Sequence, residues 1–399
     1  MVDDAALRTV YFGTPAFAVP SLATLIQSRH QVVALVSQPD RPRGRGHHLA
    51  ATPTKELALL SGIPVLQPTK LREDAFLAQL AALHPDLGVV AAYGRILPDA
   101  LLRIPRLGMI NVHASLLPKY RGAAPVHRAV IAGDEVTGVT IMRVVTELDA
   151  GPMLAMVSRP IAPDATSVEV ERSLAEAGAG LLLDVVDRLA CGPVDEVAQD
   201  HSRATYAPKL LKSEGPIDWT RPARLIHNRV RGLQPWPMAS ATLDGFRMLI
   251  HRTMVGDVGP DAAPGTVIEA RGDVLAVAAG DGTILRILEI QPEGRRVMHV
   301  REFLSGRQLS AGISFGSGCL RLHVLRRTGC CVRSIEAGRI CRPRLPACAS
   351  VWRMNAIARS PARSPQGRSG GRGPTMPSSP RSPGGPPRSS TRRSSTSCG

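Results

Sequence analysis

Apolar and polar positions follow two different periods along the first 190 residues. Short, almost continuous apolar runs at 31–37 and 87–92 are typical of strands buried on both faces of a sheet. Between such runs lie segments with apolar residues three or four positions apart, at 17–28 and 167–189, which predict amphipathic helices. Thr52 followed by Pro53 predicts the start of another helix, over 52–60.

Alternation of strands and helices favours a mostly parallel sheet with helices on both faces. We therefore expect a Rossmann-like α/β domain over residues 1–190, followed by an aperiodic linker over 191–208. From 209 to 315, Asp-Gly pairs at 244–245 and 281–282 separate short strands and favour hairpins. This part is predicted to be a small antiparallel β-barrel, OB-like, with a helix over 220–233 capped by Thr220.

The segment 111–122, with the sequence NVHASLLPKYRG, joins a predicted strand over 109–113 to a loop. Asn111 and His113 are two positions apart on that strand, so their side chains leave the same face. Asp149 lies in the loop after a predicted strand over 137–145. Parallel α/β sheets bind ligands at the carboxyl ends of their strands. Neighbouring strand ends can bring a loop carboxylate beside a histidine, so the three side chains are predicted to share a site.

An amide, an imidazole and a carboxylate suit acyl transfer to an amine. Asn111 can donate a hydrogen bond to a developing oxyanion, and His113 can move a proton near neutral pH. Asp149 can fix the tautomer of His113 and favour its charged form. Taken singly, each residue also fits a turn, a cap or a buried histidine, and spacing alone does not name the substrate. No cysteine or second histidine at metal-ligand spacing accompanies them, so we expect no metal.

The run from Asn111 to Gly122, followed by Leu-Asp-x-Gly at 148–151, resembles the active site of the folate-dependent formyltransferases. The resemblance implies that 10-formyltetrahydrofolate is the co-substrate and that Asn111, His113 and Asp149 transfer its formyl group to an amine. It also implies a pterin pocket flanked by residues 89–93. The implied folate contacts are Ser115, Leu116, Leu117 and Pro118.

A basic loop over 38–46 is similar to the loop that one branch of this family inserts at the acceptor end of its substrate, methionyl initiator tRNA. Residues 206–209, 231–237 and 306–309 also resemble that branch, and the resemblance runs from Arg8 to about Phe315. It implies formylation of the methionyl α-amine for translation initiation. Phosphate contacts of this kind orient a nucleic acid without reading its sequence. The implied tRNA contacts are Arg41, Arg43, Arg45 and Lys209.

Three alternatives stay open at this point. The acceptor could be an amino-sugar nucleotide, since the family includes such enzymes. The chain could instead be a non-catalytic tRNA-binding protein whose basic tail makes the contacts. The arginines of the 38–46 loop could equally belong to a solvated turn.

The net charge of +16 is concentrated in the last part of the chain. Residues 316–399 contain 16 arginines and one glutamate, without lysine or aspartate, so they hold +15 and leave the rest at +1. Six of the seven cysteines also lie there, and only Cys191 lies in the body. The Pro-, Gly- and Ser-rich composition predicts disorder. We interpret the tail as non-native, frame-shifted or read-through sequence; a basic nucleic-acid arm and a disulfide-bonded module are the alternatives.

The N-terminal segment does not resemble a targeting sequence. It carries Asp3 and Asp4 and leads directly into a strand-like run, unlike a signal peptide. No stretch of 18 or more apolar residues occurs, so no membrane association is expected. We expect a cytoplasmic, monomeric protein.

Overall fold

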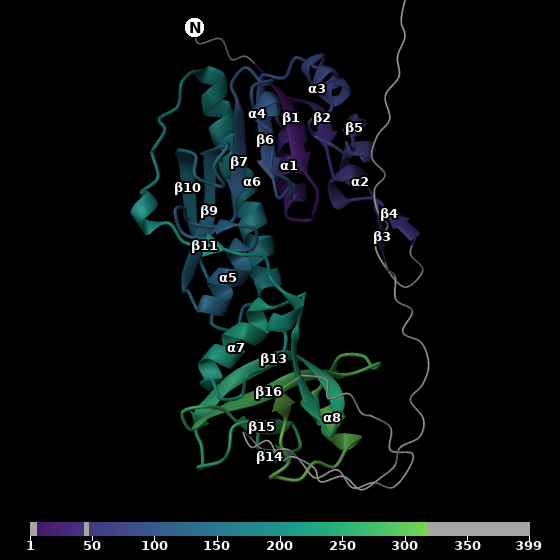
Figure 1. The fold of residues 1–399 in the computed structure, drawn as a ribbon, viewed down its shortest axis with the longest axis vertical. Coiled ribbons are helices and arrows are strands. Elements are labelled where there is room, and N and C mark those ends of the chain that lie inside the picture. Colours follow the sequence, from purple (N-terminus) through teal and green to yellow (C-terminus); the bar gives the residue numbers. More distant parts are fainter. Residues whose placement is uncertain (1–5, 44–47, 318–399) are drawn as a thin grey trace, which may run out of the picture. The chain divides into compact units, whose positions relative to one another are not determined.

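A computed structural model describes residues 6–43 and 48–317. The first domain is built on a seven-stranded sheet with the order β10-β9-β7-β6-β1-β2-β5 (Figure 1). The pairs from β7 to β5 are parallel, and β9 and β10 add antiparallel strands at one edge. The predicted, mostly parallel sheet is confirmed. The strands are β1 (Arg8–Gly13), β2 (Gln31–Val36), β5 (Val65–Leu66), β6 (Leu87–Ala91), β7 (Met109–His113), β9 (Val136–Arg143) and β10 (Met153–Pro160).

Helices cover both faces of this sheet, as predicted. Ile110 and Val112 share a core with side chains of α1 (Ala18–Gln27), α5 (Pro125–Ala132) and α6 (Ser167–Cys191). Met109 shares a separate core with α3 (Asp74–Ala81) and α4 (Asp99–Leu102). Since side chains alternate along a strand, Asn111 and His113 lie on the Met109 face. None of the helices in the described ranges is long and apolar enough to cross a membrane.

Local sequence signals explain where several elements begin and end. Helix α2 (Pro53–Leu60) starts as predicted, because the Thr52 hydroxyl accepts a hydrogen bond from the Lys55 amide at 3.3 Å. At both predicted Asp-Gly turns the backbone is left-handed. The φ angles are 50° and 81° at residues 244–245, and 57° and 66° at residues 281–282. Such angles select the hairpin turns that match strand twist.

The second domain is an antiparallel sheet with the order β14-β15-β16-β13-β12-β18, and β17 pairs with β16. The amide of Val267, in β14, donates to the carbonyl of Ile313 at 2.7 Å. Three residues after Ile313 the same segment forms β18 (Gly316–Ser317) and pairs with β12, so it links the two edges of the sheet as in a barrel. The elements are α7 (Ala223–Gly232), β12 (Ala239–Leu243), β13 (Phe246–Val258), β14 (Val267–Arg271), β15 (Val274–Ala278), β16 (Thr283–Pro292), β17 (Met298–His299), α8 (Val300–Ser305) and β18 (Gly316–Ser317).

Some predictions differ from the structure. Helix α7 begins at Ala223, after Pro222, and the Thr220 hydroxyl donates instead to Asp218 at 2.6 Å. The residues predicted to be a linker return to the first domain, where β11 (Tyr206–Ala207) pairs with β8 (Arg121–Gly122). The predicted tail overlaps β18 by two residues, and its remainder, 318–399, lies outside the described residues.

Candidate active site

A cavity of about 640 Å³ lies at the carboxyl end of the parallel strands. Its walls come from residues that follow β1, β6 and β7, from the loop between β9 and β10, and from α5 and α6. This edge is where α/β sheets bind their ligands. Asn111, His113 and Asp149 all line the cavity, so the structure brings the predicted trio together.

The side chains of Asn111 and His113 are presented by β7. Opposite them on the antiparallel strand β9 lie Met142 and Thr140. His113 is buried, with 5% of its surface exposed, whereas Asn111 is half-buried. Within the described part of the chain no hydrogen bond engages the Asn111 carboxamide, so both of its N–H groups are available to a ligand.

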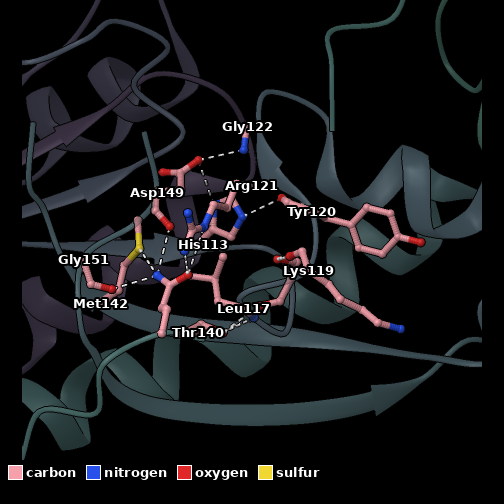
Figure 2. Close-up of polar contacts among 12 residues, drawn as sticks. His113, Leu117, Lys119, Tyr120, Arg121, Gly122, Thr140, Met142, Asp149 and Gly151 are labelled. Carbon is pink, nitrogen blue, oxygen red and sulfur yellow. Dashed lines mark hydrogen bonds and ion pairs between the residues drawn. The ribbon is translucent and has the colours of Figure 1, made fainter. Parts of the chain in front are cut away.

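The backbone fixes the tautomer of His113. Its Nε2 lies 3.0 Å from the carbonyl oxygen of Tyr120, and a carbonyl can only accept, so Nε2 carries hydrogen (Figure 2). Tyr120 has a left-handed backbone, with φ of 62°. In the neutral ring Nδ1 is therefore unprotonated, and it lies 3.7 Å from Asp149 Oδ2. The tautomer is set by Tyr120 and not, as predicted, by Asp149, whose carboxylate lies on the Nδ1 side of the ring.

Asp149 reaches His113 by a different route from the predicted one. Strand β9 runs antiparallel to β7, so its end at Arg143 lies beside Ile110, at the start of β7. The β9–β10 loop must therefore return along β7. A Cβ on Gly151 would lie 2.0 Å from the carbonyl oxygen of Arg143, so this return requires glycine. The amide of Gly122 then donates to Asp149 Oδ2 at 2.8 Å and orients the carboxylate (Figure 2).

Two residues that the sequence did not single out hold this loop. The guanidinium of Arg121 is buried, and its Nε and Nη2 donate to Gln199 Oε1 at 3.0 and 2.7 Å. Gln199 Nε2 donates to the carbonyls of Asp149 and Gly151 at 2.9 and 2.7 Å. Gln199 lies 78 residues after Arg121 in an aperiodic segment, so no local signal marks it.

The loop over 115–118 lies outside the cavity wall and holds neighbouring backbone in place. None of its residues lines the cavity. The Ser115 hydroxyl donates to the Lys119 carbonyl at 2.6 Å, while Thr140 donates to the Ser115 carbonyl at 2.7 Å and accepts from the Leu117 amide at 3.1 Å (Figure 2). The structure gives this loop a role in holding the turn that ends at Tyr120. The folate contacts of Ser115, Leu116, Leu117 and Pro118 stay predictions.

Arg41 and Lys209, two of the residues predicted to contact tRNA, do not line the cavity. Arg41 and Arg43 belong to β3 (Arg41–Arg43), which pairs with β4 (His48–Ala50) to form a hairpin, and Arg45 lies outside the described residues. Arg41 is exposed, and its guanidinium donates to Gln38 Oε1 at 2.9 Å. Lys209 is exposed just after β11.

Known families match both domains. The family model described as "Formyl transferase" matches residues 7–186, and the model described as "Formyl transferase, C-terminal domain" matches 209–308. Across the described ranges, no group of three or more His, Cys, Asp or Glu side chains is placed to hold a metal ion. The two matches identify the chain as a formyl transferase, in agreement with its fold.

Proteins with higher sequence identity show which formyl transferases this chain resembles in sequence. A methionyl-tRNA formyltransferase of Methylococcus capsulatus is 47% identical over 304 residues, which cover 76% of this chain and 98% of that protein. One from Bacillus licheniformis is 45% identical over 309 residues, covering 77% and 98%. The chain belongs to the methionyl-tRNA formyltransferase family.

Solved structures show the same fold at much lower identity. The N-formyltransferase from Helicobacter canadensis, in complex with folinic acid and dTDP-3-aminofucose, matches with a TM-score of 0.54 at 15% identity, over 70% of this chain and 98% of that one. HypX from Aquifex aeolicus, in complex with tetrahydrofolic acid, matches with a TM-score of 0.53 at 16% identity, over 75% and 47%. At these identities the likeness concerns the fold alone.

Proposed function

We propose that this protein transfers the formyl group of 10-formyltetrahydrofolate to the α-amino group of methionyl initiator tRNA, in the cytoplasm, for translation initiation. The observation that carries the proposal is the meeting of Asn111, His113 and Asp149 at one cavity. The acceptor is supported by relatives that bear this activity in their names and align over 98% of their length.

The cavity suits a folate. Its volume of about 640 Å³ lies within the usual range for small-molecule sites, roughly 300–1,000 Å³. Val90, Ile96, Leu97 and Val144 give one wall an apolar surface for a flat ring. Tyr93 also lines this wall, and its buried hydroxyl has no hydrogen-bond partner among the residues described. When bound, 10-formyltetrahydrofolate would supply an activated formyl carbon.

Asn111 stabilises charge at the formyl oxygen. As the amine adds to the formyl carbon, that oxygen gains negative charge, and the free N–H groups of the Asn111 carboxamide donate to it. One such donor is worth about 10²–10³ in rate. Since no other described residue engages this carboxamide, it needs no rearrangement before it donates.

His113 moves a proton between the two nitrogens. Its Nδ1 is unprotonated in the neutral ring, so it accepts a proton from the amine as the new bond forms. The Asp149 carboxylate, 3.7 Å away, stabilises the charged ring until Nδ1 gives the proton to the departing nitrogen. A positioned acid or base of this kind contributes about 10²–10⁴ in rate.

Basic residues outside the cavity orient the tRNA. Arg41, Arg43, Arg45 and Lys209 carry positive charge, and phosphates are the natural partners of such side chains. The two alternative functions are not favoured. The sugar N-formyltransferase shares only the fold, at 15% identity. A purely tRNA-binding protein has no use for a catalytic trio in a folate-sized cavity.

The proposal is tested by assaying the purified protein with 10-formyltetrahydrofolate and methionyl-tRNA, with a dTDP-linked amino sugar as the second acceptor. We expect formyl-methionyl-tRNA and no formylated sugar. Asn111→Ala should lower kcat by about 10²–10³ and leave tRNA binding nearly unchanged. Removal of residues 318–399 should leave formylation intact. Formylation of the amino sugar alone would contradict the proposal, and so would the loss of all activity when residues 318–399 are removed.

A further inference from the structure

A second imidazole and a second carboxylate line the cavity, and the mechanism above does not use them. Glu171 lines the cavity from α6, and His127 lines it from α5. Neither residue belongs to the strands that carry the trio. Figure 1 shows α5 next to α7, whereas α6 runs along the sheet.

Glu171 and His127 lie on the wall of the cavity opposite the apolar wall that suits folate. Helices α5 and α6 pack on the sheet face of Ile110 and Val112. The apolar wall that contains Tyr93 and Leu97 belongs to the core on the other face. A donor bound along that wall leaves the Glu171 side of the cavity for the amine that attacks it.

The Glu171 carboxylate lacks an internal partner. The residue is half-buried, and in the part of the chain that the structure describes no hydrogen bond or ion pair engages its side chain. Burial raises the pKa of the Glu171 carboxyl above its ordinary value, and the nearby His127 imidazole partly opposes this shift. A desolvated carboxylate without a cation is unfavourable, so the site is complementary to a cationic group.

His127 connects this wall to the second domain. Its Nδ1 lies 2.9 Å from the carbonyl oxygen of Gly232, the last residue of α7, so Nδ1 carries hydrogen. The ring is thereby held in place by a residue of the domain that follows the linker. Arg95, His113, His127, Glu147 and Asp149 are the other charged or ionisable groups, besides Tyr93, that line the cavity.

The reaction requires a second proton acceptor. The α-amine of the acceptor is an ammonium group near neutral pH, with a pKa of about 7.7–8.0. An ammonium has three N–H bonds, and the amide product keeps one. His113 carries one of the two lost protons to the departing nitrogen, so the other must leave through a different group.

We infer that Glu171 receives the α-ammonium of the aminoacyl acceptor and takes one proton from it before the amine attacks. An N–H bond of the ammonium breaks and an O–H bond forms on the carboxylate, giving a neutral amine and a neutral carboxylic acid. Because Glu171 is only half-buried, its carboxyl then returns the proton to water. The inference rests on the proposed function, since it presupposes an amine carried by tRNA.

The test compares kcat/KM for methionyl-tRNA of the wild type and Glu171→Gln at pH 7 and pH 9. Without Glu171 only the fraction that arrives as neutral amine reacts, roughly 10–15% at pH 7 and above 90% at pH 9. We therefore expect about a tenfold loss at pH 7 that disappears at pH 9, with an unchanged KM for folate. Glu171→Asp, which keeps a carboxylate, should recover part of the rate at pH 7.

Glu176→Gln serves as the matched control, because Glu176 is exposed on the same helix and does not line the cavity. A Glu171→Gln enzyme that equals the wild type at both pH values would overturn the inference. So would a loss of equal size at both, since that indicates a structural effect. Inactivity of the wild type itself with methionyl-tRNA would refute the proposed function instead, so the two failures are distinguishable.

Discussion

Replacing Gln199 by alanine tests whether the segment between the domains holds the active-site loop in place. The carboxamide of Gln199 is buried, with 5% of the residue exposed. Its oxygen accepts two hydrogen bonds from Arg121, and its nitrogen donates to the carbonyls of Asp149 and Gly151. Alanine removes these contacts at once, on both the guanidinium side and the loop side.

The expected loss of stability follows from the groups left without partners. A buried charged donor that loses its acceptor costs about 1.5–3 kcal/mol, and each unpaired carbonyl about 1 kcal/mol or more. Arg121 keeps longer contacts with Glu147 at 3.7 Å and His201 at 3.5 Å, which offset part of this. We expect the free energy of unfolding to fall by about 3 kcal/mol. We also expect kcat to fall about tenfold or more, because the Asp149 carboxylate is no longer held beside His113.

Urea unfolding and kcat at saturating folate and methionyl-tRNA measure the two effects separately. Gln199→Glu is the informative companion, because its carboxylate still accepts from Arg121 but cannot donate to the carbonyls of Asp149 and Gly151. The Gln199→Glu protein should lose less free energy of unfolding than Gln199→Ala, but its kcat should fall by as much. A Gln199→Ala protein that loses less than about 1 kcal/mol and keeps its kcat would refute this account of the loop.

Three further predictions concern the loop, a helix cap and the tRNA contacts. Gly151→Ala should abolish most activity, since its Cβ would meet a backbone oxygen at 2.0 Å, whereas Gly180→Ala, in open space on α6, should raise the free energy of unfolding by about 0.5–1 kcal/mol. The backbone amide of Thr166 at the helix cap, and to a smaller extent the Arg252 side chain of β13, donate hydrogen bonds that lower the pKa of Glu169 to about 2. The stability that this ionised carboxylate adds to the fold is therefore present above pH 4.5 and is lost as the pH falls toward 2. Because this carboxylate is 46% exposed, Glu169→Gln should cost only about 1 kcal/mol in urea unfolding at pH 7, and the difference from wild type should shrink across that acid range. Arg41→Ala and Lys209→Ala should each raise KM for methionyl-tRNA and reduce its logarithmic salt dependence by about 0.7–0.9, with folate KM unchanged; an unaltered salt dependence would remove that residue from the tRNA surface.

Those parts of the fold that rest on local signals were predictable. The Asp-Gly turns, the Thr52 cap and the buried apolar runs each specify a short segment by its own backbone preferences. The start of α7 was not predicted correctly because two local signals compete there. The Thr220 hydroxyl is engaged by Asp218, and Pro222 then sets where the helix can begin.

Within the candidate site, predictability depends on distance along the chain. Asn111 and His113 lie two positions apart on one strand, so their common face follows from strand geometry. The approach of Asp149 depends on a return loop that only Gly151 permits, and the strand pairing that makes the loop necessary is antiparallel. Gln199 contacts the loop across about 50 residues, and a single glutamine in an aperiodic segment has no pattern that announces such a contact.

The proposed separation of proton chemistry between two walls gives a role to the contact that joins the cavity to the second domain. In the proposed mechanism His113 carries the proton that passes between two nitrogens, and β7 together with the Tyr120 carbonyl fixes the position of its ring. The proton that leaves for water needs a group that meets both the incoming acceptor and solvent, and Glu171 on α6 meets both requirements. Its neighbour His127 is held by Gly232 of the second domain. An acceptor that touched both domains would act, through Gly232 and His127, on the wall proposed to prepare its amine, whereas the wall proposed for the donor lies within the first domain.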